Sequence, residues 1–197
     1  RKLEVKGEEE FANMGVSYCA TCDGPFYMGL DVFVVGGGES ALEEALYLTK
    51  FAKSVTIIHR RDEFRASQLV VDKVKDNEKI KFCLDSVVHE IKGDKEAKSV
   101  VVQNVKTKEL TELKSDNGDP IGVFIFVGYI PQTEIFEGKI DMNYGYIITD
   151  EDMKTNIEGV FAVGDTRQKS VRQMVTAAGD GCVAAVVANR YLEGQAW

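Results

Sequence analysis

The fold is decided by the stretch Val32-Phe33-Val34-Val35-Gly36-Gly37-Gly38-Glu39-Ser40-Ala41-Leu42-Glu43-Glu44-Ala45. Four β-forming residues run into three glycines and then, without a linker, into a segment whose apolar residues have helical spacing. A strand, a tight turn and a helix in this order form the phosphate-binding part of a dinucleotide-binding unit. The stretch therefore predicts a Rossmann-like α/β fold in this part of the chain.

Three positions of the turn match the pattern G-x-G-x-x-G/A, namely Gly36, Gly38 and Ala41. Gly36 permits the turn, Gly38 lets the backbone approach a pyrophosphate, and Ala41 lets the helix pack closely on the strand. The phosphates would lie at the helix N-terminus, where N–H groups and the helix dipole attract negative charge. The alternative is an ordinary glycine turn. The candidate nucleotide-binding residues of this turn are Gly36, Gly37, Gly38, Glu39, Ser40 and Ala41.

A basic cluster follows the next expected strand, residues 54–58. It contains His59, Arg60, Arg61 and Arg65 in a chain whose formal net charge is −8. A unit that prefers NAD would place an acidic residue here to bind the ribose 2′-hydroxyl, whereas guanidinium groups bind a 2′-phosphate through charge-assisted hydrogen bonds. The cluster therefore predicts NADP(H) rather than NAD(H) as the cofactor. A solvated group of charges is the alternative.

Cys19 and Cys22 form a C-x-x-C motif that permits either a disulfide or two ligands to zinc. A structural zinc site needs about four ligands, and the sequence has no second C-x-x-C or H-x-x-x-H motif. We therefore expect no metal and favour redox chemistry over two inert thiols. Asp23 follows directly, and when protonated it could deliver a proton to a departing sulfur. Its alternative role is to cap the turn before Gly24 and Pro25.

The bulk properties exclude several classes of function. The net charge of −8 argues against a nucleic acid or an anionic membrane as the main partner. No apolar run approaches the length of a transmembrane helix, and the polar N-terminus has no signal-peptide core. Four cysteines with one close pair do not make a secreted disulfide framework, so we expect a cytoplasmic protein. The start without methionine indicates a fragment.

The remaining pattern predicts two domains, residues 1–127 and residues 128–197, with a candidate hinge at 128–132. Within the first, residues 1–18 are expected to be a linker, and the short alternating runs of residues 86–114 predict an inserted β-meander. Periodicity and apolar runs predict the other elements of this domain, which are helices at 39–52 and 66–76 and strands at 54–58, 80–84 and 121–127.

The second domain is expected to contain a short strand at 146–148, a β-run at 159–163 and a long helix from about 171 to 192. Gly164 and Asp165 follow the β-run and precede the helix. A strand that ends in Gly-Asp ahead of a helix N-terminus can hold a sugar hydroxyl or a phosphate oxygen. The same residues would equally serve as a turn and an N-cap.

Four ordered motifs between residues 12 and 192 together resemble a bacterial-type, low-molecular-weight thioredoxin reductase. They are Cys19–Gly24, Gly36–Ala45, His59–Asp62 with Phe64–Ala66, and Gly159–Asp165 followed by Arg172, Gln173 and Thr176–Cys182. The resemblance implies an oxidoreductase in which NADPH reduces FAD, FAD reduces a disulfide, and the resulting dithiol reduces thioredoxin. It implies that Cys19 and Cys22 form this disulfide and that Asp23 is the neighbouring acid.

The resemblance also assigns the cofactors. NADPH would be held by Gly36, Gly38, His59, Arg60, Arg61 and Arg65. FAD would lie along Asp165, Arg172 and Gln173. The implied fold is a three-layer FAD/NAD(P)-binding Rossmann-like domain with an inserted β-meander, followed by part of a second FAD-binding domain.

The chain departs from the family at its beginning. Family members start with another strand and glycine turn that bind the ADP half of FAD well upstream of the redox cysteines, whereas eighteen residues precede Cys19 here. We therefore expect a fragment that lacks the N-terminal FAD-binding half-domain, binds FAD weakly or not at all, and dimerises when full length. The flavoprotein subunit of an alkyl hydroperoxide reductase and an NADPH-binding module without turnover are the alternatives.

Overall fold

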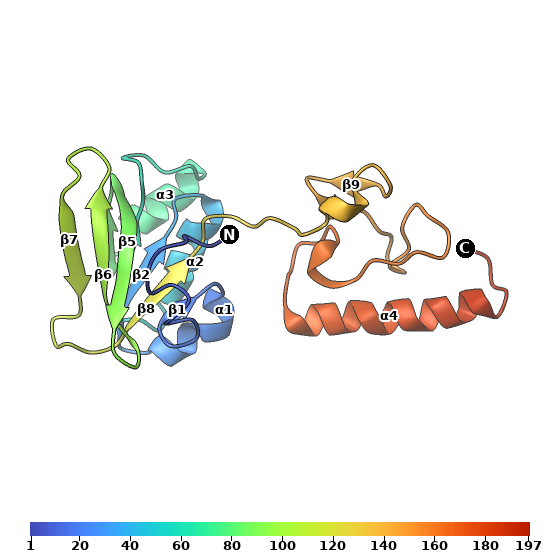
Figure 1. Cartoon of the computed structure of the whole chain (residues 1–197), viewed down its shortest axis with the longest axis horizontal. Helices are drawn as coiled ribbons and strands as arrows, with labels where there is room; N and C mark the ends of the chain where they lie inside the picture. Colours follow the sequence, from blue (N-terminus) through green and yellow to red (C-terminus); the bar gives the residue numbers. More distant parts are fainter. The chain divides into compact units, whose positions relative to one another are not determined.

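The computed structural model describes all residues from Arg1 to Trp197. They divide into two compact units, Arg1–Gly128 (unit 1) and Tyr129–Trp197 (unit 2), which are described separately (Figure 1). None of the helices combines the length and the apolar character needed to cross a membrane.

Unit 1 is built on a five-stranded parallel sheet with the strand order β1-β8-β2-β3-β4. Its strands are β1 (Val16–Ser17), β2 (Asp31–Val35), β3 (Ser54–Ile58), β4 (Ile80–Cys83) and β8 (Ile121–Ile125). β2 lies at the centre, and Val32 and Val34 on one face and Phe33 and Val35 on the other are all buried. A strand that is covered on both faces must be apolar throughout. This explains the continuous apolar run that precedes the glycines.

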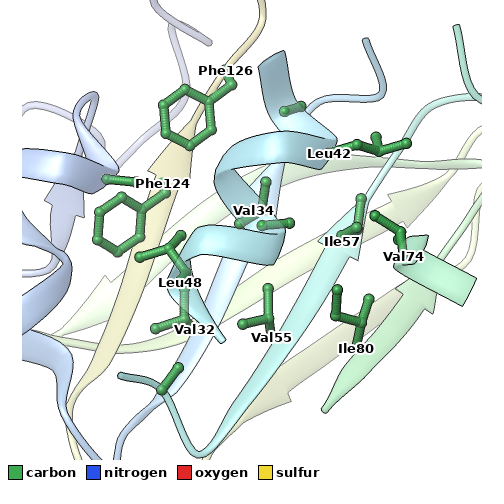
Figure 2. Packing of buried hydrophobic residues seen from close by; sticks show 14 of the residues in the cluster. Val32, Val34, Leu42, Leu48, Val55, Ile57, Val74, Ile80, Phe124 and Phe126 are labelled. Carbon is green, nitrogen blue, oxygen red and sulfur yellow. The ribbon is translucent and has the colours of Figure 1, made fainter. Parts of the chain in front are cut away.

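Helices cover one face of this sheet (Figure 1). They are α1 (Ala20–Asp23), which continues into the 3-10 helix η1 (Gly24–Tyr27), α2 (Glu39–Leu48) and α3 (Gln68–Lys75). In Figure 2, α2 lies over the sheet with Leu42 and Leu48 on the helix and Val34 and Ile57 on the strands, and all four side chains are fully buried. Burial of each such side chain contributes roughly 1.5–3 kcal/mol. α2 is thereby fixed with its N-terminus directly after the glycines.

A three-stranded antiparallel meander covers the opposite face (Figure 1). It consists of β5 (Ser86–Gly93), β6 (Ala97–Asn104) and β7 (Leu110–Lys114). Val88 and Val100 of the meander pack in one cluster with Phe33 and Val35 of the sheet. The three-layer α/β fold and its inserted meander are therefore confirmed. His89 is exposed at a register shift in β5.

Residues 1–18 are not the expected linker, because they pack on unit 1. Phe11 is 2% exposed within the meander cluster, and Val16 belongs to β1. The carboxylate of Glu8, itself buried, accepts hydrogen bonds from the N–H groups of Leu3 and Glu4 and from the Tyr18 hydroxyl. The many charges of this segment suggested solvent, but a buried carboxylate that satisfies backbone donors is part of the fold.

Unit 2 contains little regular structure besides one long helix. Its elements are η2 (Glu134–Phe136), β9 (Met142–Asn143), β10 (Tyr146–Ile147), η3 (Gly164–Thr166) and α4 (Met174–Leu192). The expected β-run at 159–163 is wrong as a strand, because Phe161 forms only an isolated bridge with Lys154 and no ladder extends from it. α4 begins at Met174 rather than near residue 171, because Gln173 and Thr176 form a capping box.

Candidate nucleotide and redox sites

The C-x-x-C motif and the glycine turn both lie at the carboxyl edge of the parallel sheet of unit 1. Cys19 follows β1, and Gly36 follows β2. Both strands run parallel to β8, which lies between them. Ligands of open α/β sheets bind outside the carboxyl ends of the strands, where neighbouring connections run in opposite directions. The disulfide motif and the glycine turn thus lie at the edge where such a fold places its chemistry.

The three glycines of the turn have different neighbours. Gly36 has a φ of +149°, and a Cβ there would lie 2.4 Å from the carbonyl oxygen of Phe126 and 2.8 Å from the Ala41 Cβ. At Gly37, a Cβ would lie 2.2 Å from Nδ1 of His59. A Cβ at Gly38 would meet nothing closer than the Arg65 carbonyl oxygen at 4.0 Å. Only Gly38 therefore faces open space.

Gly38 is also the N-cap of α2 and forms no side-chain cap. The first N–H groups of a helix have no partners within it, and without a capping side chain they remain available to an anion. Ser40, in this first turn, is exposed, and Ala41 is buried against Gly36. Gly36, Gly38 and Ala41 thus have the backbone conformation, the open space and the close packing that the dinucleotide-binding pattern requires.

Glu39, which was predicted to contact the nucleotide, binds another residue of unit 1. Its carboxylate accepts hydrogen bonds from the N–H of Ser67, at 2.6 Å, and from the Ser67 hydroxyl, at 2.7 Å. These bonds lower the pKa of Glu39, the backbone N–H having the larger effect. The contact joins the start of α2 to the N-cap of α3. Residue pattern alone does not reveal it, because the two residues are 28 positions apart.

The basic cluster separates into one buried and three exposed side chains. Arg60, Arg61 and Arg65 are exposed, and none of them forms an ion pair. The nearby carboxylate of Asp62 is paired instead with Lys106 at 3.4 Å. Three guanidinium groups with uncompensated charge at this position are suited to a doubly charged phosphate.

The histidine of the cluster, His59, is 8% exposed. Burial lowers its pKa, and the guanidinium groups of the loop act in the same direction, against a hydrogen bond to the Glu63 carbonyl. The imidazole is therefore neutral at pH 7.

Cys19 and Cys22 form a disulfide with a Cα–Cα distance of 5.3 Å. Cys19 is the N-cap of α1 and is half-buried, whereas Cys22 is exposed. The Oδ2 atom of Asp23 accepts a hydrogen bond from the Ser17 hydroxyl at 2.7 Å, and the same hydroxyl accepts one from the Cys19 N–H at 3.1 Å. Ser17 is buried and fixes the acid next to the disulfide. Sequence analysis missed it, although a polar residue in a buried strand is a usable signal.

The predicted FAD-facing residues lie in unit 2. Asp165 is exposed, and Gln173 caps α4. The guanidinium carbon of Arg172 lies 4.1 Å from the centre of the Tyr146 ring. The Nε atom of Arg172 is buried without a hydrogen-bond partner. A stacked arginine with one unsatisfied donor is consistent with a polar group that binds there.

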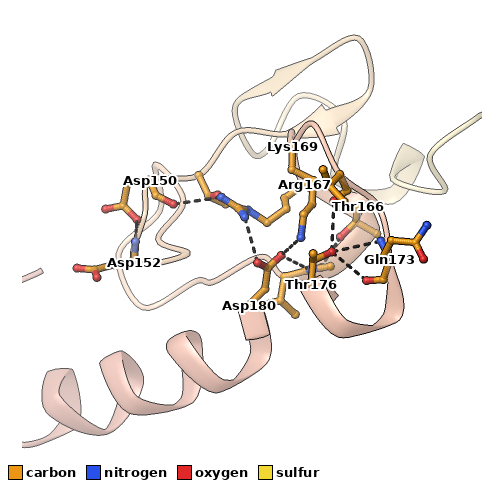
Figure 3. Close-up of polar contacts among 12 residues, drawn as sticks. Asp150, Asp152, Thr166, Arg167, Lys169, Gln173, Thr176 and Asp180 are labelled. Carbon is orange, nitrogen blue, oxygen red and sulfur yellow. Dashed lines mark hydrogen bonds and ion pairs between the residues drawn. The ribbon is translucent and has the colours of Figure 1, made fainter. Parts of the chain in front are cut away.

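Gly164 is held by Asp180, which sequence analysis did not single out. Figure 3 shows Asp180 with its ion-pair partners Arg167 and Lys169. The Asp180 carboxylate, on α4, accepts hydrogen bonds from the Gly164 N–H at 3.0 Å, from Lys169 Nζ at 2.7 Å and from Arg167 Nη1 at 3.3 Å. Burial raises the pKa of Asp180, but Lys169, the Gly164 N–H and Arg167 together lower it below its usual value. One carboxylate therefore fixes the turn that carries Asp165.

Replacement of Asp180 by asparagine is expected to destabilise unit 2 by about 3 kcal/mol, because it leaves two mostly buried cations without a counter-charge. The side chains of Lys169 and Arg167 are only 11% and 13% exposed. Urea unfolding followed by the fluorescence of Trp197, the single tryptophan, measures the effect. Trp197 packs edge-on against two other aromatic rings of unit 2.

Asp152→Asn is the matched control, because Asp152 is 55% exposed and pairs with Lys154. Loss of such an exposed pair costs less than about 1 kcal/mol. The folded-state pKa of Asp180 lies below the usual value of 3.8, so its contribution is present above that pH and is lost as the pH falls through the folded pKa. Equal stability of D180N and D152N at neutral pH would contradict the structural role of Asp180.

Comparison with known proteins places these sites in a family. The pyridine nucleotide-disulphide oxidoreductase family matches residues 1–181. A thioredoxin reductase of Peptoclostridium acidaminophilum is 53% identical over 189 residues, which cover 95% of this chain and 60% of that protein. A thioredoxin reductase of Listeria monocytogenes is 48% identical, covering 98% of this chain and 60% of that protein.

Solved structures give the same result. The crystal structure of thioredoxin reductase from Streptococcus pyogenes has a TM-score of 0.92 at 48% identity, covering 99% of this chain and 63% of that one. For thioredoxin reductase from Giardia duodenalis the TM-score is 0.86 at 42% identity, and the coverages are 98% and 62%. The chain thus spans about 60% of the length of the relatives that it matches. Because the family match extends over residues 1–181, the chain belongs to the pyridine nucleotide-disulphide oxidoreductases.

Proposed function

We propose that this chain provides the NADPH site and the redox disulfide of a thioredoxin reductase. The observation that carries the proposal is a Cys19–Cys22 disulfide at the same sheet edge as a glycine turn and three unpaired arginines. NADPH bound at the glycine turn and the arginines would supply a hydride, and its electron pair would reach the Cys19–Cys22 disulfide through FAD. Two electrons and two protons convert the disulfide into two thiols, which in turn reduce a disulfide of thioredoxin or a related protein.

The residues of unit 1 fit NADPH. Gly38 presents an open backbone at the start of α2, where the pyrophosphate would bind. Arg60, Arg61 and Arg65 project from the following loop and would bind the 2′-phosphate. The Ser17 hydroxyl, which donates a hydrogen bond to Asp23 and accepts one from the Cys19 N–H, holds the Asp23 carboxyl group beside the disulfide. This arrangement supports an NADPH site and a redox disulfide within the same unit.

The residues of unit 2 fit part of an FAD site. The unsatisfied Nε of Arg172 and the exposed Asp165 are available to a polar ligand. The glycine turn that would bind the ADP half of FAD is not among the motifs that carry the resemblance. We therefore propose that the 197 residues alone bind FAD weakly. Copurification of a flavin spectrum in near-equimolar amount would contradict this part of the proposal.

Single replacements of Arg60 and Arg61 by alanine are expected to weaken NADPH binding about 10- to 100-fold, because each removes a hydrogen bond between charged groups worth roughly 1.5–3 kcal/mol. Binding of NADH, which has no 2′-phosphate, should change by less than about threefold. Titration calorimetry with both nucleotides measures the difference. Arg190→Ala, at an exposed position of unit 2, is the control. Equal affinity of the unaltered chain for NADH and NADPH would refute the assignment.

A nucleotide-binding module without turnover is a second candidate, because the glycine turn and the three exposed arginines all lie in unit 1. The flavoprotein subunit of an alkyl hydroperoxide reductase is a further alternative. Turnover of NADPH with thioredoxin as acceptor, measured with and without added FAD, separates the reductase from the module without turnover.

We also propose a cytoplasmic location, which the free thiols of Cys83 and Cys182 support, and a homodimer for the full-length protein.

A further inference from the structure

His59 fills the space between the glycine turn, residues 36–38, and the arginine loop, residues 60–65. Its Nδ1 would lie 2.2 Å from a Cβ at Gly37, so the ring occupies the place where any larger residue would put its side chain. The Nε2 atom lies 3.2 Å from the carbonyl oxygen of Glu63. The ring also stacks on Phe64 with a centroid distance of 5.6 Å and an interplanar angle of 27°. His59 therefore contacts the turn on one side and the middle of the loop on the other.

The end of the loop is tied to the turn by the main chain. The Arg65 N–H donates a hydrogen bond to the Gly37 carbonyl at 2.7 Å, and Gly38 and Arg65 form a parallel bridge. Just beyond, Ser67 is bound by the Glu39 carboxylate. These bonds fix where the loop ends. Its beginning is held by main-chain hydrogen bonds, from the Ser86 N–H to the His59 carbonyl at 2.9 Å and from the Asp85 N–H to the Arg61 carbonyl at 3.2 Å. Its middle, Glu63 and Phe64, is in contact with the ring of His59.

The three arginines need such support. Their guanidinium groups are exposed and have no carboxylate partner, so no ion pair holds them in place. Each sits at the end of a long, flexible side chain, and its position therefore depends on the loop backbone. His59 does not share their task, because it is buried and uncharged at neutral pH.

We propose that His59 is a positioning residue, which holds the arginine loop on the glycine turn and thereby sets the preference for a nucleotide that carries a 2′-phosphate. The inference rests on the proposed NADPH site and revises one part of it, since His59 was expected to bind the nucleotide itself. Loss of the ring should loosen the middle of the loop, Glu63 and Phe64, which directly precedes Arg65. The arginines would then spend less time where they can bind the phosphate together, whereas the pyrophosphate cradle would stay.

The test uses two probes, 2′-phospho-ADP-ribose and ADP-ribose, which differ only in the 2′-phosphate. Calorimetric titration of the whole chain gives the ratio of their affinities. In His59→Ala this ratio should fall by about tenfold or more, while the affinity for ADP-ribose changes by less than about threefold. His59→Phe, which keeps a flat ring between Gly37 and Phe64, should retain the ratio to within about threefold. His89→Ala replaces the only other histidine, which is exposed, and should change neither affinity.

Each outcome decides the matter. An unchanged ratio in folded His59→Ala overturns the proposal. An equal loss in His59→Ala and His59→Phe also overturns it, because it would mean that the packing of the ring between Gly37 and Phe64 is not what holds the loop. If His59→Ala does not fold, Phe64→Leu removes the stacking from the loop side and carries the same expectation. If the unaltered chain does not distinguish the two probes, the proposed NADPH site fails as well. That result differs from a failure of the positioning role alone.

Discussion

Replacement of Cys22 by serine is expected to abolish the reducible pair completely. The unaltered chain has two free cysteines, Cys83 and Cys182, and reduction of the Cys19–Cys22 disulfide exposes two more thiols. The variant should show three thiols under denaturing conditions both before and after mild reduction. Transfer of reducing equivalents through this chain should stop, because a single cysteine cannot form the intramolecular disulfide that accepts the electron pair. Quantification with a thiol reagent measures the count, and reduction of thioredoxin by the full-length protein measures the activity.

The Cys22→Ser variant should still fold. The disulfide closes a loop of four residues, and in the chain-entropy treatment such a short loop contributes about 2 kcal/mol. Cys182→Ser is the control, because Cys182 is exposed on α4 and unpaired. It should lower both thiol counts by one and leave the gain of two intact. A Cys22→Ser variant that still gained two thiols on reduction would contradict the assignment of the redox pair.

Local pattern was sufficient for the central strands and the meander of unit 1, although not for residues 1–18. Val32–Val35 and Ile121–Ile125 are apolar throughout because both of their faces are covered, and this property is visible in sequence. The meander was equally visible, because an alternating strand has a period of two. The expected run at 159–163 has the same composition but no neighbour with which to form a ladder. Strand composition predicts a strand only where the chain also supplies its partner.

Most of the contacts that shape the candidate sites could not be predicted from local sequence pattern. Glu39 looked like a nucleotide ligand because of its place after the glycines, yet it binds Ser67. Asp180 lies among small residues of a helix, and nothing local indicates that Lys169 and Gly164 converge on it. His59 was grouped with the arginines by charge, although burial separates it from them. In each case the residue type was informative, and the partner was fixed by tertiary packing.

Alanine at two positions of the glycine turn is expected to have opposite effects on stability. Gly36→Ala should destabilise unit 1 by about 3 kcal/mol or more, because the new methyl group overlaps a main-chain carbonyl and the residue keeps a φ of +149°. Gly38→Ala should leave stability unchanged or raise it by about 0.4–1 kcal/mol, because its φ of −93° suits alanine and its Cβ meets open space.

The Gly38→Ala variant should bind nucleotides more weakly, although it is as stable as the unaltered chain or more stable. Its new methyl group stands where a pyrophosphate approaches the N-terminus of α2, so affinity for NADPH and ADP-ribose should fall together by about tenfold or more. The common loss distinguishes this variant from the arginine variants, which discriminate between nucleotides with and without the 2′-phosphate. Urea unfolding and calorimetric titration of the same preparations give both quantities. Unimpaired binding by a stable Gly38→Ala chain would mean that the phosphates do not bind at this turn, since no other glycine of the three has room for them.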